Sequence, residues 1–447
     1  MSLPHYPEYK DSGVPWLGEV PEHWVVTPIK HLGKLKGGSG FPHAEQGFDS
    51  EELSFHKVNA LGQAGDNGIL LRGENTISYN TAERLGAFVF PAGTSVFAKV
   101  GAALLLGRIR KLGQAACIDN NMMGFVVEEI SSHIDFVRYA LNLVRFDLIA
   151  NPGAVPSLNE AQIGDFYLAV PDKNEQTAIA SFLDRETGKI DALIAEQEKL
   201  LTLLAEKRQA TISHAVTKGL NPDVPMKDSG VEWLGEVPKH WVVKRLKTIS
   251  PFITVGIVVN PSEYVSDDGL PFIYGGDISE GKISTETSRR ISPEDSDRQT
   301  KTKLEAGDLL TVRVGAPGIT AVVPESCAGG NCASVMLTRR GNFNSVWLSY
   351  AMNSRMVRYQ VEVVQYGAAQ EQFNISHAIN FWIATPPNEE QFAIAAFLDH
   401  EVAKLDALTA EATRAIELLK ERRSALISAA VTGKIDVRNL VAEEVAA

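Results

Sequence analysis

The sequence predicts an α+β protein made of two copies of one structural unit, because two segments occur twice in the same order. Residues 10–24 (KDSGVPWLGEVPEHW) return 217 positions later as residues 227–241 (KDSGVEWLGEVPKHW), identical at thirteen of fifteen positions. Residues 175–191 (EQTAIASFLDRETGKID) return 215 positions later as residues 390–406 (EQFAIAAFLDHEVAKLD). Self-similarity over so long a period indicates tandem units with an internal pseudo-two-fold symmetry.

Each unit ends in a segment with the periodicity of a long helix. Residues 174–216 contain no proline and one glycine. Apolar residues recur there at intervals of four and three, as in a coiled coil. The first stripe is Ile179, Leu183, Ile190, Leu193, Leu200 and Leu204. The second is Ile394, Leu398, Leu405, Leu408, Ala412, Ala415, Leu419 and Leu426.

The two helices, each roughly 60 Å long, are predicted to pair with one another. The short segment 220–226 must return the chain to the second globular region, which favours an antiparallel coiled coil. In the alternative, each helix packs only on its own globular region, and the shared stripe disfavours this arrangement.

Prolines and glycines set the expected boundaries. Pro171, Pro386 and Pro387 precede the helices, and Gly219 and Gly433 follow them. The expected parts are an arm with a first globular region (1–172), a long helix (173–219), an arm with a second globular region (220–386), a long helix (387–434) and a tail (435–447).

The two globular regions share a frame but differ in their loops. Residues 87–110 indicate short strands broken by glycine turns, and residues 134–149 indicate one amphipathic helix, matched by 345–362. Weaker matches link 92–102 with 306–316, 121–127 with 331–337, and 157–171 with 372–386. A repeated frame with divergent loops is typical of two readers of different short targets.

Composition indicates a globular cytoplasmic protein, with 44% hydrophobic residues, no membrane span and no secretion signal. Cys117, Cys327 and Cys332 are expected to be buried free thiols. The net charge is −12, yet the variable regions are near neutral, with 12 basic and 14 acidic residues in 25–170 and 14 of each in 242–385. This distribution is compatible with a local basic face for DNA.

The sequence lacks the common motifs of catalysis. It has no GxxxxGK[ST] phosphate loop, no glycine-rich dinucleotide fingerprint, no HExxH and no GxSxG. It also has no Asn/Asp-Pro-Pro-aromatic motif of amino-methyltransferases, and its histidines show no metal-ligand spacing. The absence of all these motifs disfavours an enzyme, and we expect no metal or cofactor in this chain.

Three features resemble the specificity subunits of type I restriction–modification enzymes, from Tyr9 to about Lys434. They are the repeated arm K-D-S-G-V-x-W-L-G-E-V-P-x-H-W, the sequences VFAKVGA and LTVRVGA, and the helix start P-x-x-x-E-Q-x-x-I-A-x-F-L-D. One departure is that the first copy has Pro171-Asp172-Lys173 where the second has the double proline usual in the family.

The resemblance implies a non-catalytic subunit with two target-recognition domains, each reading one half of a bipartite target in double-stranded DNA. It implies that the helix pair sets the spacer and docks two adenine methyltransferase subunits, which use S-adenosylmethionine. Two motor–nuclease subunits that use ATP and Mg²⁺ would complete the complex. The alternatives are a DNA methyltransferase or nuclease acting by itself, and an adaptor that binds only protein.

Candidate DNA-binding residues lie in both variable regions. Lys99 and Arg313 follow predicted strands at matching positions, where each either contacts DNA or is a solvated charge. The matched pair Asn159 and Asn374 either bonds an adenine edge or stabilises a turn, and the turn is favoured. Residues 36–43 are expected to form a mobile polar loop that enters a groove, unlike the matching 255–264. The candidates in this loop are Lys36, Ser39, Phe41 and His43.

The remaining candidates are basic, polar or aromatic. The densest basic cluster is Arg289, Arg290, Lys301 and Lys303, for which phosphate contact is favoured over a solvated face. Further DNA-binding candidates are Lys57, Arg108, Arg110, Tyr274 and Gln372. Candidates for partner binding on the helices are Glu186, Lys207, Arg208, Glu401, Arg422 and Arg423.

Two groups of residues recur at equivalent positions of the two units. Glu186 and Glu401 interrupt the apolar stripes at equivalent positions. A solvated edge is favoured over a contact that sets the helix register or binds a partner. The repeated tryptophans are expected to be structural and to pin each arm against the base of its globular region. They are Trp16, Trp24, Trp233 and Trp241.

Overall fold

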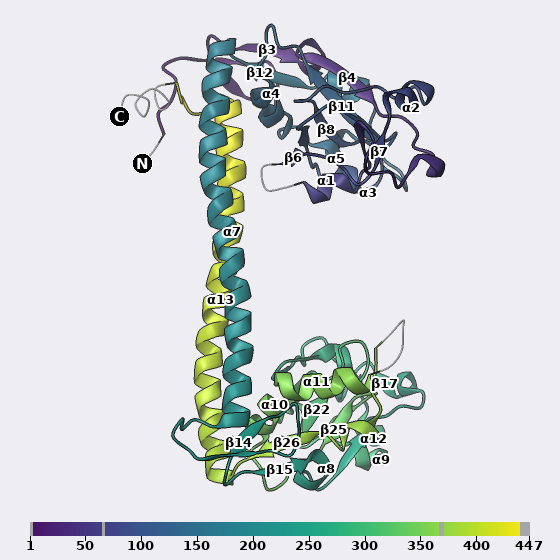
Figure 1. Cartoon of the computed structure of the whole chain (residues 1–447), viewed down its shortest axis with the longest axis vertical. Helices are drawn as coiled ribbons and strands as arrows, with labels where there is room; N and C mark the ends of the chain where they lie inside the picture. Colours follow the sequence, from purple (N-terminus) through teal and green to yellow (C-terminus); the bar gives the residue numbers. More distant parts are fainter. Residues whose placement is uncertain (1–2, 65–67, 366–370, 439–447) are drawn as a thin grey trace. The chain divides into compact units, whose positions relative to one another are not determined.

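The computed structural model has mixed α and β content and divides into two units (Figure 1). It describes residues 3–64, 68–365 and 371–438. Unit 1 comprises Met1–Glu198 and Arg414–Ala447, and unit 2 comprises Lys199–Thr413. Each unit therefore contains one globular region, part of the first long helix and part of the second.

The globular region of unit 1 is built on two sheets. The larger has strand order β4-β11-β8-β9-β6, and the smaller has order β10-β5-β7. The strands are β4 (Gly33–Gly37), β5 (Leu53–His56), β6 (Ile69–Leu70), β7 (Thr76–Ile77), β8 (Ser95–Ala98), β9 (Arg110–Leu112), β10 (Ala116–Ile118) and β11 (Met122–Val127). The inner strands β8 and β11 are almost continuously apolar because they are buried on both faces.

Short helices connect the strands of unit 1, and they correct two predictions. They are α1 (Ala60–Gln63), α2 (Tyr79–Arg84), α3 (Ala102–Leu105), α4 (Ile134–Leu141), α5 (Phe146–Ile149) and α6 (Glu160–Gly164), with 3₁₀ turns η1 (Ile29–His31) and η2 (His43–Glu45). The α3 turn replaces part of the strands expected in 87–110. The single helix expected over 134–149 is two helices, because the Asn142 amide bonds the Arg138 and Tyr139 carbonyls where α4 ends.

The globular region of unit 2 has a similar plan. Its sheets have orders β16-β25-β22-β23 and β17-β21-β18-β24, beside the hairpin β19-β20. The strands are β16 (Ile253–Val255), β17 (Val265–Ser266), β18 (Leu270–Ile273), β19 (Ile278–Ser279), β20 (Lys282–Ile283), β21 (Arg289–Ile291), β22 (Leu309–Thr311), β23 (Thr320–Val322), β24 (Asn331–Cys332) and β25 (Met336–Thr338).

The helices of unit 2 correct the single helix expected over 345–362. They are α8 (Leu246–Ile249), α9 (Pro293–Arg298), α10 (Ser345–Asn353), α11 (Arg355–Val364) and α12 (Ile375–Ala378), with 3₁₀ turns η3 (Pro261–Tyr264), η4 (Gly275–Asp277), η5 (Thr300–Thr302) and η6 (Glu325–Cys327). The buried Asn353 amide bonds the backbone N–H and carbonyl of Thr320 on β23, and α10 ends there. The chain becomes helical again as α11, after Ser354.

Two small antiparallel sheets lie where each arm meets its globular region. In unit 1 they are β1 (Tyr9–Asp11) with β2 (Glu19–Pro21), and β3 (Val25–Pro28) with β12 (Tyr167–Val170). In unit 2 they are β13 (Met226–Asp228) with β14 (Glu236–Pro238), and β15 (Val242–Arg245) with β26 (Trp382–Thr385). The last strand of each globular region thus pairs with the strand that follows the arm.

Strand register corrects one of the sequence matches. Met123 pairs with Phe97 in unit 1, and Met336 pairs with Thr311 in unit 2. Because 92–102 corresponds to 306–316, Met123 corresponds to Met336. The match of 121–127 with 331–337 aligns Met123 with Ala333 instead and is wrong by three residues. Similar apolar runs do not reveal a register, which only the strand pairing defines.

The two long helices are present as α7 (Lys173–Lys218) and α13 (Asn388–Val431). Gly219 and Gly433, both with positive φ, follow their ends. In unit 1 the Arg423 guanidinium bonds the Asp191 carboxylate at 2.8 and 3.2 Å, so α13 lies beside α7 there (Figure 1).

The predicted apolar stripes are only partly correct. Ile179, Leu183, Ile394 and Leu398 are buried against the globular regions. Leu193, Leu200 and Leu408, however, are 51%, 40% and 49% exposed. Ile190 and Leu204 of the first stripe, and Leu405 and Ala412 of the second, are buried. The exposed leucines are therefore single positions between buried members of the same stripes.

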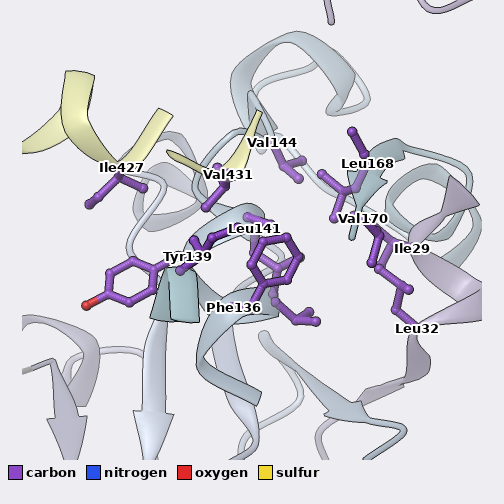
Figure 2. Close-up of a cluster of buried hydrophobic side chains, with 14 of the residues drawn as sticks. Ile29, Leu32, Phe136, Tyr139, Leu141, Val144, Leu168, Val170, Ile427 and Val431 are labelled. Carbon is purple, nitrogen blue, oxygen red and sulfur yellow. The ribbon is translucent and has the colours of Figure 1, made fainter. Parts of the chain in front are cut away.

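The main core of unit 1 joins the arm, the globular region and both long helices. Ile427 and Val431 of α13 lie beside Phe136, Tyr139 and Leu141 of α4 (Figure 2). Trp24 from the arm belongs to the same cluster. A corresponding core in unit 2 contains Trp241 and Ile212. The end of one long helix and the start of the other therefore belong to the core of each unit.

Candidate nucleic-acid interface

The repeated Glu-Gln pair at the start of each long helix fixes the arm. In unit 1 the Glu175 carboxylate accepts hydrogen bonds from Tyr6 Oη at 2.6 Å and Trp24 Nε1 at 3.2 Å, and it bonds His23 Nε2 at 2.8 Å. Its side chain is only 4% exposed. Burial and the bond to Glu175 raise the pKa of Tyr6, so its hydroxyl remains a donor.

Unit 2 has the same joint in a more exposed form. Glu390 accepts from Trp241 Nε1 at 2.8 Å and bonds His240 Nε2 at 2.5 Å, and its side chain is 40% exposed. Trp24 and Trp241 are fully buried, which confirms their structural role. Trp16 stacks on Phe166, and Trp233 lies against Tyr359. The arms are therefore held to the helix starts as well as to the globular regions.

The glutamine of each pair holds the loop before a helix of the globular region. Gln176 accepts from the His133 backbone N–H at 2.8 Å and donates to the Pro171 carbonyl at 2.9 Å. Gln391 accepts from the Asn344 N–H and donates to the Pro386 carbonyl, both at 2.9 Å. Both glutamines thus connect the long helix to the same two places in the globular region.

The aspartate of each Phe-Leu-Asp sequence makes the third contact. Asp184 accepts from Tyr139 Oη on α4 at 2.7 Å, and Asp399 accepts from Tyr350 Oη on α10 at 2.9 Å. The repeated helix start is thus a joint in which three polar side chains each bond a different element. Sequence reasoning found the motif but missed this role, because the bonded partners lie far away along the chain.

The matched residues Lys99 and Arg313 lie at equivalent crossings of two segments. The Lys99 carbonyl accepts from the Leu158 N–H, and the Arg313 carbonyl accepts from the Phe373 N–H. Both side chains are half-buried. Arg313 also donates from Nε to the Phe373 carbonyl at 3.3 Å. Arg313 lies two residues after β22. Its side chain therefore extends from a loop and not from the end of the strand.

Three lysines of unit 1 lie on or just after β4, β5 and β8. Lys99 Nζ lies against Gly37, where an added Cβ would be 2.7 Å away. Lys36, exposed on β4, places its Nζ 4.6 Å from the centre of the Phe88 ring. Lys57 donates to Gln46 at 3.1 Å. We call these three lysines the basic rim, and their charges suit contact with phosphates.

A buried carboxyl group, Asp119, lies close to the basic rim. Burial raises its pKa, and the backbone N–H groups of Asn121 and Val58 and the charges of Lys57 and Lys99 partly oppose this rise. Asp119 is therefore a buried carboxyl group next to the rim, and it accepts a hydrogen bond from the Asn121 backbone N–H at 2.8 Å.

Residues 36–43, predicted to form a mobile polar loop, are irregular over 38–42 but are anchored at several points. Lys36 and Gly37 end β4, and the Ser39 N–H donates to the Ile118 carbonyl at 3.0 Å. Phe41 stacks on Phe55 with ring centres 3.9 Å apart. His43 begins η2 and is exposed. The segment packs against β10 and β5. Only single exposed side chains, such as those of Lys36 and His43, are therefore available for contact with DNA.

Unit 2 has different side chains at the corresponding strand ends. Tyr274 follows β18 as Lys57 follows β5. The Arg289 guanidinium lies 4.1 Å from the centre of the Tyr274 ring. Burial raises the pKa of Tyr274, and the neighbouring Arg289 partly opposes this rise. A stacked Arg–Tyr pair is suited to contact with a base edge or a base face.

The basic cluster predicted for unit 2 is not compact. Arg289 pairs with Phe272, Phe272 pairs with Asn331, and Asn331 bridges to Lys303. Arg289 and Lys303 are therefore three strand spacings apart, about 14 Å. Lys303 is also paired with Asp297, while Lys301 is exposed and Arg290 is half-buried on β21.

Several other candidates have structural roles. Asn159 and Asn374 are the N-caps of α6 and α12, where each side chain accepts a backbone N–H. This is the turn-stabilising role that the sequence favours. Arg110 donates to the Leu61 carbonyl, whereas Arg108 is exposed. Gln372 is half-buried and bridges Val314 in the strand pairing.

The helix residues predicted to bind a partner divide into two groups. Arg208 and Arg423 are engaged within the chain: Arg208 bonds Asp406 and Glu280, and Arg423 bonds Asp191. Glu186 and Glu401 bond lysines one helical turn away on their own helices, Lys189 and Lys404, in accord with a solvated edge. Lys207 and Arg422 are exposed. Partner binding by these residues stays a prediction.

Metal clusters and membrane spans are absent from the described residues. In residues 3–64, 68–365 and 371–438, no three His, Cys, Asp or Glu side chains are grouped to hold a metal ion. Across the same ranges no helix combines the length and apolarity needed to cross a bilayer. The three cysteines are buried and free, as expected.

The fold and the site define a class of protein in which two globular regions of like plan, with different strand-end side chains, are joined to two long helices. No model of a protein family matches the chain. The Escherichia coli type I restriction enzyme EcoBI specificity subunit is 23% identical over 339 residues, covering 72% of this chain and 70% of the relative. The Methanocaldococcus jannaschii MjaVIII specificity subunit is 22% identical over 293 residues, covering 64% and 66%.

Solved structures agree in fold. A chain of a type I restriction–modification system superposes with a TM-score of 0.64 at 16% identity, covering 92% of this chain and 98% of that one. The HsdS subunit of Thermoanaerobacter tengcongensis gives a TM-score of 0.50 at 16% identity, covering 93% and 98%. The chain is thus a homologue of type I restriction enzyme specificity subunits, as the resemblance indicated.

Proposed function

We propose that this chain is the non-catalytic DNA-recognition subunit of a type I restriction–modification complex. Each globular region reads one half of a bipartite DNA target. The observation that carries the proposal is a contrast between the units: their joints match, but the side chains at their strand ends differ. Lys57 of unit 1 corresponds to Tyr274 of unit 2, and Asp119 corresponds to Ala333. Two half-sites of different sequence require such a contrast.

The long helices are proposed to pair as an antiparallel coiled coil that relates the units by a pseudo-two-fold axis and sets the spacer. Two ion pairs support this proposal. Asp191 and Arg208 are 17 residues apart on α7, and their partners Arg423 and Asp406 are 17 residues apart on α13 in the opposite direction. Equal and opposite spacing is the register of antiparallel helices with equal rise.

The same helices are proposed to dock two methyltransferase subunits, with two motor–nuclease subunits completing the complex. S-adenosylmethionine, ATP and Mg²⁺ belong to those partners. Lys207, Arg422 and the exposed Leu193, Leu200 and Leu408 support a contact surface on the helices. Exposed leucines beside charged residues are typical of a protein interface.

The competing function is a DNA methyltransferase or nuclease acting by itself. The purified chain, incubated with S-adenosylmethionine and duplex DNA, should transfer no methyl group. The chain mixed with a methyltransferase subunit of a type I system should methylate adenine at one bipartite sequence. Methyl transfer by the chain alone would contradict the proposal, as would methylation without sequence preference in the complex.

A second experiment addresses the spacer. Inserting four residues after Leu193 adds about 6 Å and one turn to α7. The insertion should lengthen the preferred spacer, estimated at about 5–8 base pairs from half-sites one helical turn apart, or abolish recognition. An insertion variant that still modifies DNA with the original spacer would show that the helices do not set it.

A further inference from the structure

The N-terminus of α4 in unit 1 opens on a cavity of about 470 Å³ with a mixed polar and apolar lining. Its lining includes Lys111 of β9, Lys173 at the start of α7, and Ser132 and His133 just before α4. His133 is the N-cap residue of α4, but its side chain makes no capping hydrogen bond. The first N–H groups of a helix have no acceptor within the helix, so those of α4 are open to a ligand.

Two side-chain atoms at this cavity have no partner. Ser132 is 1% exposed, and neither its Oγ nor His133 Nδ1 has a hydrogen-bond partner within the described part of the chain. A buried hydroxyl without a partner costs free energy, because it has lost its bonds to water. Such groups are rare in folded proteins unless they serve a ligand, an ion or a water molecule.

Unit 2 provides an internal comparison at the equivalent place. Val322 occupies the position of Lys111, because Ser95 pairs with Lys111 as Leu309 pairs with Val322. Asn388 occupies the position of Lys173, because each lies two residues before the glutamate of the Glu-Gln pair. Both lysines of the cavity are therefore neutral residues in unit 2.

The equivalent helix of unit 2 is also capped. Asn344 corresponds to His133, because their N–H groups bond the equivalent glutamines Gln391 and Gln176. The Asn344 side chain accepts the Trp347 N–H at 2.9 Å and so satisfies the start of α10. The two lysines and the uncapped helix start thus occur together in unit 1 and are replaced together in unit 2.

One carboxylate of the cavity is already engaged by cations. Asp135 Oδ1 is bonded by Lys111 Nζ at 2.8 Å and by Arg138 Nε at 3.0 Å. Arg138 also bonds Asp184 at 3.3 Å. These charges balance one another, so Lys111 can offer its remaining N–H groups to a ligand while Asp135 stays paired.

The second lysine of the cavity has no such carboxylate. Lys173 Nζ bonds the Glu129 backbone carbonyl, and it forms no ion pair within the described residues. The Glu129 side chain is exposed to solvent. The charge of Lys173 therefore adds to the positive end of the α4 dipole, which favours an anion at this place.

We propose that this cavity binds a phosphate-class oxyanion. The anion oxygens would accept hydrogen bonds from the first N–H groups of α4, from Ser132 Oγ and from the Lys173 and Lys111 ammonium groups. A helix N-terminus with flanking lysines and a hydroxyl is a general arrangement for phosphate. The chemistry is shared by free phosphate esters and by the phosphodiesters of bound DNA.

Binding of inorganic phosphate to the full chain tests the proposal, measured by ³¹P line broadening and by the shift in thermal midpoint against chloride at equal ionic strength. Ser132→Ala and Lys173→Met should each weaken phosphate binding by about tenfold, the value of one lost charge-assisted hydrogen bond. His133→Asn, which supplies the cap of unit 2, should also weaken it. Lys34→Met, which removes an exposed lysine outside the cavity, is the control.

Ser132→Ala keeps the test free of folding effects, because Ser132 Oγ has no partner to lose within the described residues and the basal thermal midpoint should not fall. DNA binding by Lys173→Met at fixed salt separates the sources. Loss of phosphate binding alone assigns the site to a free phosphate or phosphate ester, and loss of both assigns it to the DNA backbone. Phosphate binding unchanged in Ser132→Ala and Lys173→Met would overturn the proposal.

Discussion

The joints of the two units use the same side chains, whereas the strand ends do not. Glu175 and Glu390 hold Trp24 and Trp241 by the same bond to the indole N–H. At the strand end, Lys57 of unit 1 is replaced by Tyr274 of unit 2. The repeated sequence therefore determines how each globular region is attached to the long helices. The variable sequence determines which side chains each globular region presents to its proposed DNA half-site.

The largest expected effect is on the free energy of unfolding, and it should differ between the joints of unit 1 and unit 2. Glu175→Ala leaves the Tyr6 hydroxyl and Trp24 indole buried without an acceptor, and should lower the free energy of unfolding by about 3 kcal/mol. Glu390→Ala acts on a side chain that is 40% exposed, so water replaces the lost acceptor and the loss should be about 1 kcal/mol. Urea denaturation measures both, and equal losses would refute the difference between the joints.

Acid should affect unit 1 more than unit 2. Burial lowers the pKa of His56 on β5 to about 4, and the equivalent residue of unit 2 is Ile273. The unfolded chain takes up a proton near pH 6.5 and the folded chain does not. Stability should therefore be full above pH 6.5 and fall progressively to about pH 4, by roughly 3 kcal/mol in total.

Hydrogen–deuterium exchange measures this acid effect locally. Peptides covering β5 should lose protection between about pH 6.5 and pH 5 faster than peptides covering β18. The variant His56→Ile should remove the difference. A wild-type β5 that is no more acid-sensitive than β18 would contradict the burial of a neutral His56.

A smaller effect is expected on DNA affinity. Arg313→Ala should weaken DNA binding in the partner complex by roughly 1–3 kcal/mol without unfolding the chain. Arg298→Ala is a matched control, because Arg298 is exposed on α9 and paired with Glu294. Affinity for DNA that is unchanged at fixed salt would show that Arg313 acts only within the fold.

The smallest expected effect concerns the helix caps. Asn159→Ala and Asn374→Ala should each cost about 1 kcal/mol of stability. The loss should be greater for Asn159, which shares a reciprocal capping box with Gln162. Neither variant should alter the DNA sequence that the complex methylates. A change in that sequence would show that these asparagines contact bases.

Local patterns allow much of this fold to be predicted. Proline-free periodicity identifies α7 and α13, and the repeats identify two units. The breaks at Asn142 and Asn353 escape prediction, because an amide that bonds a carbonyl three or four residues back, or a neighbouring strand, leaves no periodic signal. The exposure of Leu193 and Leu200 also escapes prediction, because apolar spacing marks a stripe but does not tell which of its positions another element covers.

The site is less predictable than the fold. The matched Lys99 and Arg313 do lie at equivalent crossings, since their sequence repeat includes the glycine turns on either side. Asp119 and Phe88, which shape the basic rim of unit 1, escape prediction because their partners arrive from other strands. The oxyanion cavity likewise depends on side chains from β9, α7 and the start of α4, which no sequence motif joins.

Exchange of one variable region tests the central claim most directly. Residues 242–385 are replaced by the corresponding region of a relative, the joints are kept, and the methylated sites are mapped in cells that carry the partner subunits. The account predicts that one half of the bipartite motif changes while the other half and the spacer stay the same. A change in both halves, or in neither, would contradict it.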